Sequence, residues 1–187
     1  FRDMQLCGAS PETLVTLLDG KLSTYPLAGT CRRTEDEGET EALIAELLQD
    51  PKELAEHDML VDLGRNDLGK VSRFGSVSVD RYRSIKKLSH VCHIASRVCS
   101  EIKEGAEALD ALAAVLPAGT LSGAPKRRAC EIIDAIEGQK RGAYGGAVGY
   151  IDFTGNMDLC IGIRMAVLKD QKVYVQAGAG IVTDSVE

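Results

Sequence analysis

The stretch of the sequence richest in groups that could bind or react is residues 116–126, Leu-Pro-Ala-Gly-Thr-Leu-Ser-Gly-Ala-Pro-Lys. Pro117 and Pro125 have no N–H group, and Gly119 and Gly123 permit a positive φ, so the stretch cannot be regular structure. It joins two segments of helical pattern and brings backbone N–H groups, two hydroxyls and a helix N-terminus to one place. Such a place suits an anion. A plain helix–loop–helix connection would have the same residues, with glycines that serve only its conformation.

Two glutamates, Glu53 and Glu56, lie in a second segment of helical pattern, just before His57 and Asp58. Residues three apart share a helix face, and paired carboxylates suit a hard cation such as Mg²⁺. A solvated acidic face would look the same, so both interpretations stand.

Two histidines, His90 and His93, lie in a segment with the alternating pattern of a strand. Three residues apart in a strand, they point to opposite faces, which makes them poor joint ligands of zinc. One of them facing a pocket could perform acid–base chemistry. A purely structural histidine is the alternative.

Three further features suit a carboxylate ligand. Arg164 lies in an otherwise apolar run, twenty residues after Tyr144, and needs an anionic partner or an exposed face. A bound carboxylate would satisfy its guanidinium group with two hydrogen bonds, as would an internal salt bridge. The short segments Ala28-Gly29-Thr30 and Gly178-Ala179-Gly180 allow close approach of the backbone to a ligand, and the second can offer N–H groups to an oxyanion. Each is also typical of an ordinary turn.

The composition narrows the class of protein. The 187 residues are 44% hydrophobic and 27% charged, which is typical of a soluble globular chain with a real core. The net charge of −6 argues against nucleic acid as a partner, because binding phosphates needs a basic face. No apolar run approaches the ~20 residues of a membrane span. Six cysteines without a C-x-x-C pair are interpreted as reduced thiols of a cytoplasmic protein.

The order of the patterns predicts an α+β fold. Strands are expected over 4–9, 13–18 and 21–25, followed by a loop over 26–30. Helices are expected over 41–48 and 52–63, the second ending at 64–67. Strands over 71–83 and 89–100, helices over 105–116 and 124–136, and strands over 159–168 and 172–177 complete the prediction.

Taken together and in this order, seven blocks resemble the chorismate-utilising enzymes, and within that family they are most similar to the large subunit (component I) of anthranilate synthase. The blocks are residues 8–12, 26–30, 55–67, 89–94, 117–126, 144–158 and 176–185. The resemblance covers nearly the whole chain. It implies the chorismate-binding-enzyme fold, with antiparallel sheets flanked by helices.

The resemblance also implies roles for particular residues. Glu12 is similar to the acid that helps the ring hydroxyl leave, His93 to the histidine beside the ring in the elimination step, and Thr120 to a neighbour of the same site. Glu56 resembles a ligand of the family's Mg²⁺, which Glu53 can reach through water. The implied contacts to chorismate come from Gly29, Thr30, Tyr144, Arg164, Gly178, Ala179 and Gly180.

The implied reaction adds ammonia to chorismate and eliminates pyruvate to give anthranilate, with ammonia supplied by a glutamine amidotransferase subunit (component II). Ala28 discriminates between branches of the family, since the para-aminobenzoate branch often has a nucleophilic lysine there. An aminodeoxychorismate synthase component I remains the alternative enzyme. A non-catalytic binding module is the alternative of another class.

The chain begins with Phe1 and ends with Glu187 directly after an apolar run. It is interpreted as residues 1–187 of the C-terminal portion of a single chorismate-binding catalytic domain, truncated at both ends. The resemblance places a second Mg²⁺-binding glutamate beyond Glu187, so the isolated piece is expected to be weak or inactive. One departure from the family is Cys31-Arg32-Arg33-Thr34, where an arginine and then a glycine are usual.

Overall fold

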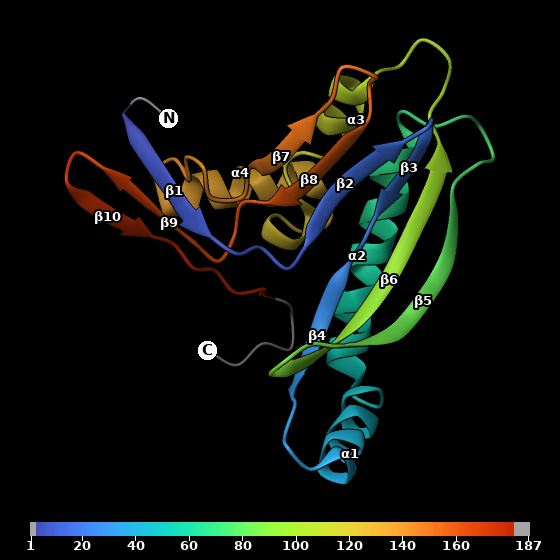
Figure 1. Cartoon of the computed structure of the whole chain (residues 1–187), viewed down its shortest axis with the longest axis vertical. Helices are drawn as coiled ribbons and strands as arrows, with labels where there is room; N and C mark the ends of the chain where they lie inside the picture. The colour runs from blue at the N-terminus through green and yellow to red at the C-terminus, as the bar shows by residue number, and fades with distance from the viewer. Residues whose placement is uncertain (1–2, 182–187) are drawn as a thin grey trace.

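The structure, a computed structural model, describes residues 3–181. Every strand pairing in it is antiparallel, and the strands form two sheets (Figure 1). The larger sheet has the order β4-β6-β3-β2-β8-β7, with β5 paired to β6, and the smaller one has the order β1-β9-β10. The strands are β1 (Met4–Gly8), β2 (Thr13–Leu18), β3 (Lys21–Thr24), β4 (Leu27–Arg32), β5 (Ser78–Lys87), β6 (Val91–Glu101), β7 (Ala147–Ile151), β8 (Met157–Ile161), β9 (Met165–Lys169) and β10 (Lys172–Val175).

Strand β6 organises the larger sheet, because it pairs with β3, β4 and β5. Its residues alternate between half-buried and fully buried from Val91 to Ser100, as expected for a strand with one face on the core. The buried face carries Cys92, Ile94 and Val98. The long helix α2 (Pro51–Gly69) packs against β6 and β4 and covers this face (Figure 1).

Helix α2 begins where the sequence indicates. The side chain of Asp50 accepts hydrogen bonds from the backbone N–H groups of Lys52 (2.9 Å) and Glu53 (3.3 Å), and Pro51 occupies the first turn. The predicted end at 64–67 is wrong, since the helix continues to Gly69. Gly64 is tolerated inside it because its bare Cα lies against β3; a Cβ there would be 3.0 Å from Thr24 Cγ2.

Residues 26–30, predicted as a loop, instead enter strand β4, which pairs with β6. The pairing shifts register between Ala28 and Thr30. Gly29, at φ 79°, makes this bulge, and an added Cβ would be 2.9 Å from Ile94 Cδ1. Glycine is therefore required here both by the backbone conformation and by the close packing.

The single strand predicted over 159–168 is also wrong. Strand β8 ends at Ile161 in the larger sheet, and β9 begins at Met165 in the smaller one. Arg164, at φ 52°, lies in the link between them. In the same way, β1 and β2 belong to different sheets, so the turn at Ser10–Glu12 is a second crossing between the sheets.

The remaining helices are α1 (Glu37–Leu47), α3 (Ala108–Val115), the short 3₁₀ helix η1 (Gly119–Leu121) and α4 (Lys126–Glu137). Helix α1 begins four residues before the predicted start, because Asp36 caps it by accepting from Glu39 N at 2.9 Å. Helix α3 packs against α2 and β2, and α4 has no buried residue. No helix within residues 3–181 is long and apolar enough to cross a membrane. All six cysteines are free thiols.

Candidate active site

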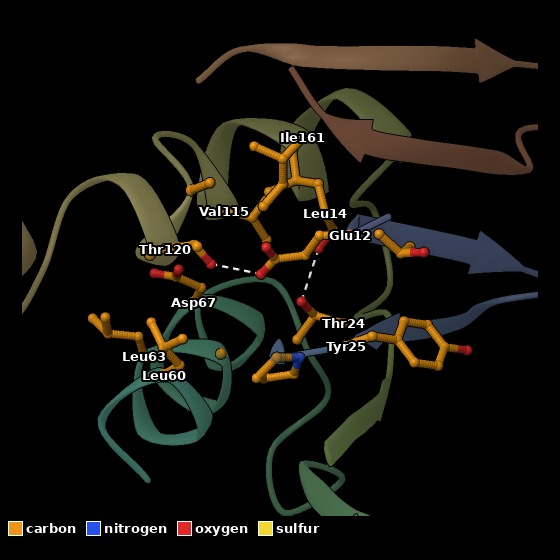
Figure 2. Close-up of a pocket in the computed structure, with 15 residues that line it drawn as sticks. Glu12, Leu14, Thr24, Tyr25, Leu60, Leu63, Asp67, Val115, Thr120 and Ile161 are labelled. Carbon is orange, nitrogen blue, oxygen red and sulfur yellow. Dashed lines mark hydrogen bonds between the residues drawn. The ribbon is translucent and has the colours of Figure 1, made fainter. Parts of the chain in front are cut away.

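Glu12 and Thr120, 108 residues apart in the sequence, meet at the centre of the candidate site. Glu12 lies on the crossing between the two sheets, and Thr120 lies in η1, inside the Gly/Pro-rich stretch. The Thr120 hydroxyl donates to Glu12 Oε1 at 2.6 Å (Figure 2). The Leu27 backbone makes a further hydrogen bond to the same carboxyl group.

The Glu12 carboxyl faces a small cavity of about 40 Å³ between α2, β2, β3 and η1. By volume this is room for only a few water molecules. Its lining is largely apolar, with Val115 and Ile161 close to Glu12 and Leu60 and Leu63 on the side of α2 (Figure 2). Glu12 is therefore only 6% exposed.

Burial changes the acidity of this carboxyl. Removal from water raises the pKa of Glu12 from 4.5 to about 7, although the Thr120 hydrogen bond, the Leu27 backbone and Arg164 oppose the rise. At neutral pH the group is therefore divided between its protonated and ionised forms. It can give up a proton or take one, as the predicted role of an acid requires.

His93 and Thr30 form a second contact, across the β4–β6 pairing. Thr30 Oγ1 lies 2.9 Å from His93 Nδ1, and the two residues are register partners. Partial burial lowers the pKa of His93, a hydrogen bond with the Gly29 backbone opposes this, and the positive charges of Arg164 and Lys86 lower the pKa further. His93 is therefore a neutral imidazole at neutral pH, with Nε2 available as a hydrogen-bond or proton acceptor.

Arg164 acts electrostatically on both Glu12 and His93. Its charge lowers the pKa values of both Glu12 and His93, and its side chain is exposed at the link between the sheets. Its backbone carbonyl accepts from Ala9 N at 3.2 Å, which fixes the link against β1. Within the described residues no carboxylate forms an ion pair with Arg164, so its guanidinium group is available for an anion.

Tyr144 and the Gly178–Gly180 segment also meet. A Cβ added to Gly178 would be 3.3 Å from the Tyr144 hydroxyl, and one added to Gly180 would be 3.0 Å from Glu56 Oε1. Ala179 lies between these two glycines. The segment thus passes from the predicted substrate tyrosine to the predicted metal ligand, with bare backbone at both contacts.

The two predicted metal ligands, Glu53 and Glu56, lie close together on the first turns of α2. Burial and the negative charge of Glu56 both raise the pKa of Glu53. Within the described residues no group of three or more His, Cys, Asp or Glu side chains could hold a metal ion. Two neighbouring carboxylates beside open backbone nevertheless fit Mg²⁺, which commonly takes one or two carboxylates together with water and substrate oxygens.

One residue of the site was not predicted from the sequence. Asp67 lines the same cavity as Glu12 and lies beside Thr120 (Figure 2). Its carboxylate accepts from Lys126 Nζ at 2.5 Å. The sequence signal was obscured by Gly64, which falsely marked the end of the helix that carries Asp67.

Comparison with known proteins shows the family and the fold of the chain. A family profile described as chorismate binding enzyme matches residues 1–187. The chain belongs to the chorismate binding enzyme family. This confirms the resemblance found from the sequence blocks; the last of these, 176–185, extends past residue 181 and so lies partly outside the described residues.

Among relatives in this chorismate binding enzyme family, the chain is 57% identical over 186 residues to a protein of Acetivibrio thermocellus named anthranilate synthase component 1. It is 54% identical over 186 residues to the protein of the same name from Aquifex aeolicus. All of this chain is matched in both cases, but only 38% of each relative. The chain therefore spans about two fifths of the length of these relatives.

Solved structures confirm the predicted fold class. A crystal structure of anthranilate synthase component I from Streptococcus pneumoniae superposes with a TM-score of 0.91 at 50% identity, covering 100% of this chain and 41% of that one. The menaquinone-specific isochorismate synthase MenF from Escherichia coli gives 0.87 at 26% identity, covering 98% and 42%. The chorismate-binding fold therefore supports more than one reaction, and the branch must be argued from residues.

Proposed function

We propose that this chain is the chorismate-binding catalytic portion of an anthranilate synthase component 1, which converts chorismate and ammonia to anthranilate and pyruvate. The observation that carries the proposal is Glu12. It is a buried carboxyl with a pKa near neutrality, hydrogen-bonded to Thr120 and close enough to Arg164 to feel its charge. The identity of 57% to a protein of that name supports the choice of reaction.

The first half of the reaction needs an acid. Ammonia adds at ring C2 while the C4 hydroxyl departs, and a departing hydroxyl must be protonated to leave as water. Protonated Glu12 supplies that proton, and the hydrogen bond from Thr120 to Oε1 orients the carboxyl. Burial in a cavity with few water molecules keeps a substantial fraction of the carboxyl protonated at neutral pH, so the acid form is present when substrate binds.

The second half needs a base. Loss of a proton from the ring and departure of the enolpyruvyl oxygen leave an aromatic ring, and aromatisation drives the reaction. The departing enolpyruvate takes up a proton on its methylene carbon to become pyruvate. Neutral His93 is suited to accept the proton at Nε2 while Thr30 holds Nδ1. Arg164, Tyr144 and the backbone of 178–180 are proposed to hold the carboxylate of the pyruvyl side chain.

The proposed cofactor is Mg²⁺, held by Glu56 and, through water, by Glu53. When bound, the ion would neutralise the ring carboxylate and offset charge that shifts onto it during the reaction. The placement of the two carboxylates supports the proposal, because Glu53 and Glu56 lie three residues apart at the start of α2 and the bare backbone of Gly180 lies beside Glu56 Oε1.

Ala28 supports the anthranilate branch. It lies in β4, one residue before the Gly29 bulge, and has no group that could attack the ring. Ammonia must then attack directly, and we propose a glutamine amidotransferase subunit as its source. A cytoplasmic location, where chorismate and glutamine are both available, is part of the same proposal.

The test uses a polypeptide of the relatives' full length that contains this chain, supplied with chorismate, Mg²⁺ and ammonium. We expect fluorescent anthranilate and an equal amount of pyruvate, with a Glu12→Gln variant as the matched control. Release of 4-amino-4-deoxychorismate, separated by chromatography, would instead assign the aminodeoxychorismate branch. Binding of chorismate without either product would indicate a binding module.

A further inference from the structure

Lys126, at the end of the Gly/Pro-rich stretch, has a partly buried side chain whose purpose the reaction does not explain. Its side chain is 15% exposed and pairs with Asp67, which is 8% exposed. The Lys126 ammonium group donates to Asp67 Oδ2 at 2.5 Å and to the Val115 carbonyl oxygen at 2.8 Å. Val115 is the last residue of α3, and Lys126 is the first of α4.

These contacts close a ring around the loop that carries Thr120. The Val115 carbonyl lies immediately before residues 116–125, and Lys126 lies immediately after them. One ammonium group therefore joins both ends of the loop, and Asp67 anchors that junction to α2. Inside the loop, Leu121 N donates to Ala118 O at 3.1 Å, which forms the turn of η1.

A buried ion pair is a poor device for stability alone. The cost of removing two charges from water commonly equals or exceeds their attraction, and apolar side chains of similar volume often serve as well. What the pair can supply is a fixed geometry. Lys70 provides a comparison within the same structure, because it also donates to Asp67 (2.9 Å) and to an α3 carbonyl, that of Ala114 (3.2 Å). Lys70 belongs to the segment after α2 and does not close the loop.

We propose that Lys126 is a positioning residue, whose ammonium group holds the loop 116–125 closed on Asp67 so that the Thr120 hydroxyl reaches Glu12. This inference rests on the proposed function, in which Glu12 and Thr120 act on the substrate. The loop packs tightly enough on α2 to transmit the constraint, since a Cβ added to Gly119 would be 3.2 Å from Leu63 Cδ1.

The test compares Lys126→Met with Lys70→Met in the full-length polypeptide, and Thr120→Val serves as the reference for loss of the hydroxyl. The primary measurement is the titration of the Glu12 carboxyl by isotope-edited infrared spectroscopy, assigned by difference from Glu12→Gln. This titration does not require the polypeptide to be enzymatically active. The other charged or titratable groups facing Glu12 are Asp67 of α2, Tyr25 after β3 and Arg164 of the β8–β9 link, and none of these is altered in the three variants.

We expect Thr120→Val to raise the pKa of Glu12 by roughly one unit, since the ionised form loses a hydrogen bond. Lys126→Met should give a shift of the same sign and similar size, and Lys70→Met should give none. The Lys126→Met, Thr120→Val double variant should match Thr120→Val alone, because both changes remove the same contact. Where turnover is measured, Lys126→Met should lower kcat about tenfold or more with KM changed much less.

An unchanged Glu12 pKa in a folded Lys126→Met protein overturns the proposal, whatever happens to its thermal midpoint. If that variant does not fold, Asp67→Asn takes its place, with a smaller shift of the same sign expected and no shift overturning the idea. If the unaltered polypeptide makes no anthranilate, the proposed function fails, while the titration still decides the role of Lys126.

Discussion

Replacing Glu12 with glutamine should abolish the loss of stability that this position causes as the pH rises across the neutral range. Glutamine has the shape of a protonated glutamate and keeps an oxygen for the Thr120 hydroxyl, but it never ionises. The wild-type carboxyl titrates near pH 7 in the fold and at 4.5 when unfolded. Because the folded pKa is the higher one, the unfolded chain binds fewer protons between these values, and stability falls as pH rises from 4.5 towards 7.

The magnitude follows from the size of that shift. The change from 4.5 to about 7, at about 1.4 kcal/mol per pH unit, corresponds to about 3 kcal/mol. Glu12 is 6% exposed, so solvent screening reduces this value little. Relative to wild type, Glu12→Gln should therefore be near neutral at pH 4.5 and stabilising by about 3 kcal/mol at pH 8.

The assay is urea denaturation of both proteins at one-unit steps from pH 4.5 to 8.5, followed by far-ultraviolet circular dichroism. Other groups titrate over this range, but they are common to both proteins, so the difference in unfolding free energy isolates Glu12. The same variant should lose activity by a factor of roughly 10²–10⁴ if the carboxyl acts as the general acid. A stability difference that stays constant with pH would refute the reasoning, because it would show that Glu12 does not carry a raised pKa.

Three further predictions concern other parts of the site. Gly29→Ala should destabilise the fold by about 3 kcal/mol, because it combines positive-φ strain with a clash in the core. Gly20 has the same φ of 79° but no atom within 4 Å of an added Cβ, so Gly20→Ala should destabilise the fold by only about 1 kcal/mol. Equal losses of stability for the two variants in thermal or urea unfolding would contradict this prediction. Added Mg²⁺ should raise the thermal midpoint of the full-length polypeptide, and Glu56→Gln should abolish the rise while Glu53→Gln only weakens it; a rise that survives Glu56→Gln would place the ion elsewhere. Arg164→Lys should raise KM for chorismate about tenfold or more, because an ammonium group cannot form the paired hydrogen bonds of a guanidinium group; an unchanged KM would remove Arg164 from the carboxylate site.

Secondary structure was predicted best from the sequence where the hydrophobic pattern is periodic or where a helix has a clear N-terminal cap. The alternation along 91–100 corresponds to β6, and Asp50-Pro51 marked the start of α2 correctly, because an acidic cap and a proline in the first turn act through local geometry alone. The family resemblance then supplied the fold and the residues to examine. Among these residues, three pairs lie in contact in the structure: Glu12 with Thr120, Thr30 with His93, and Gly180 with Glu56.

Tertiary packing decided what local pattern could not. Gly64 looked like the end of a helix because glycine usually is a poor helix former, yet here it allows α2 to lie close to β3. An apolar run over 159–168 looked like one strand, since nothing local shows that its two halves pair with different partners. The Lys126–Asp67 pair was equally hidden, because it depends on α2 continuing past Gly64.

Several of the positions that carry the proposed chemistry interrupt a regular pattern, although His93 lies in the regular strand β6 and Glu56 in helix α2. Gly29 makes a bulge next to Thr30, Arg164 breaks the run between β8 and β9, and Thr120 lies in a single 3₁₀ turn. In an uninterrupted strand alternate side chains go to the core or to solvent, and neither direction brings groups from distant segments to one point. Interruptions change that direction, which is why Arg164 can act electrostatically on both Glu12 and His93. A variant that restored regular strand geometry at Arg164 should therefore move the guanidinium charge away from Glu12 and His93, and the pKa values of both groups should then rise.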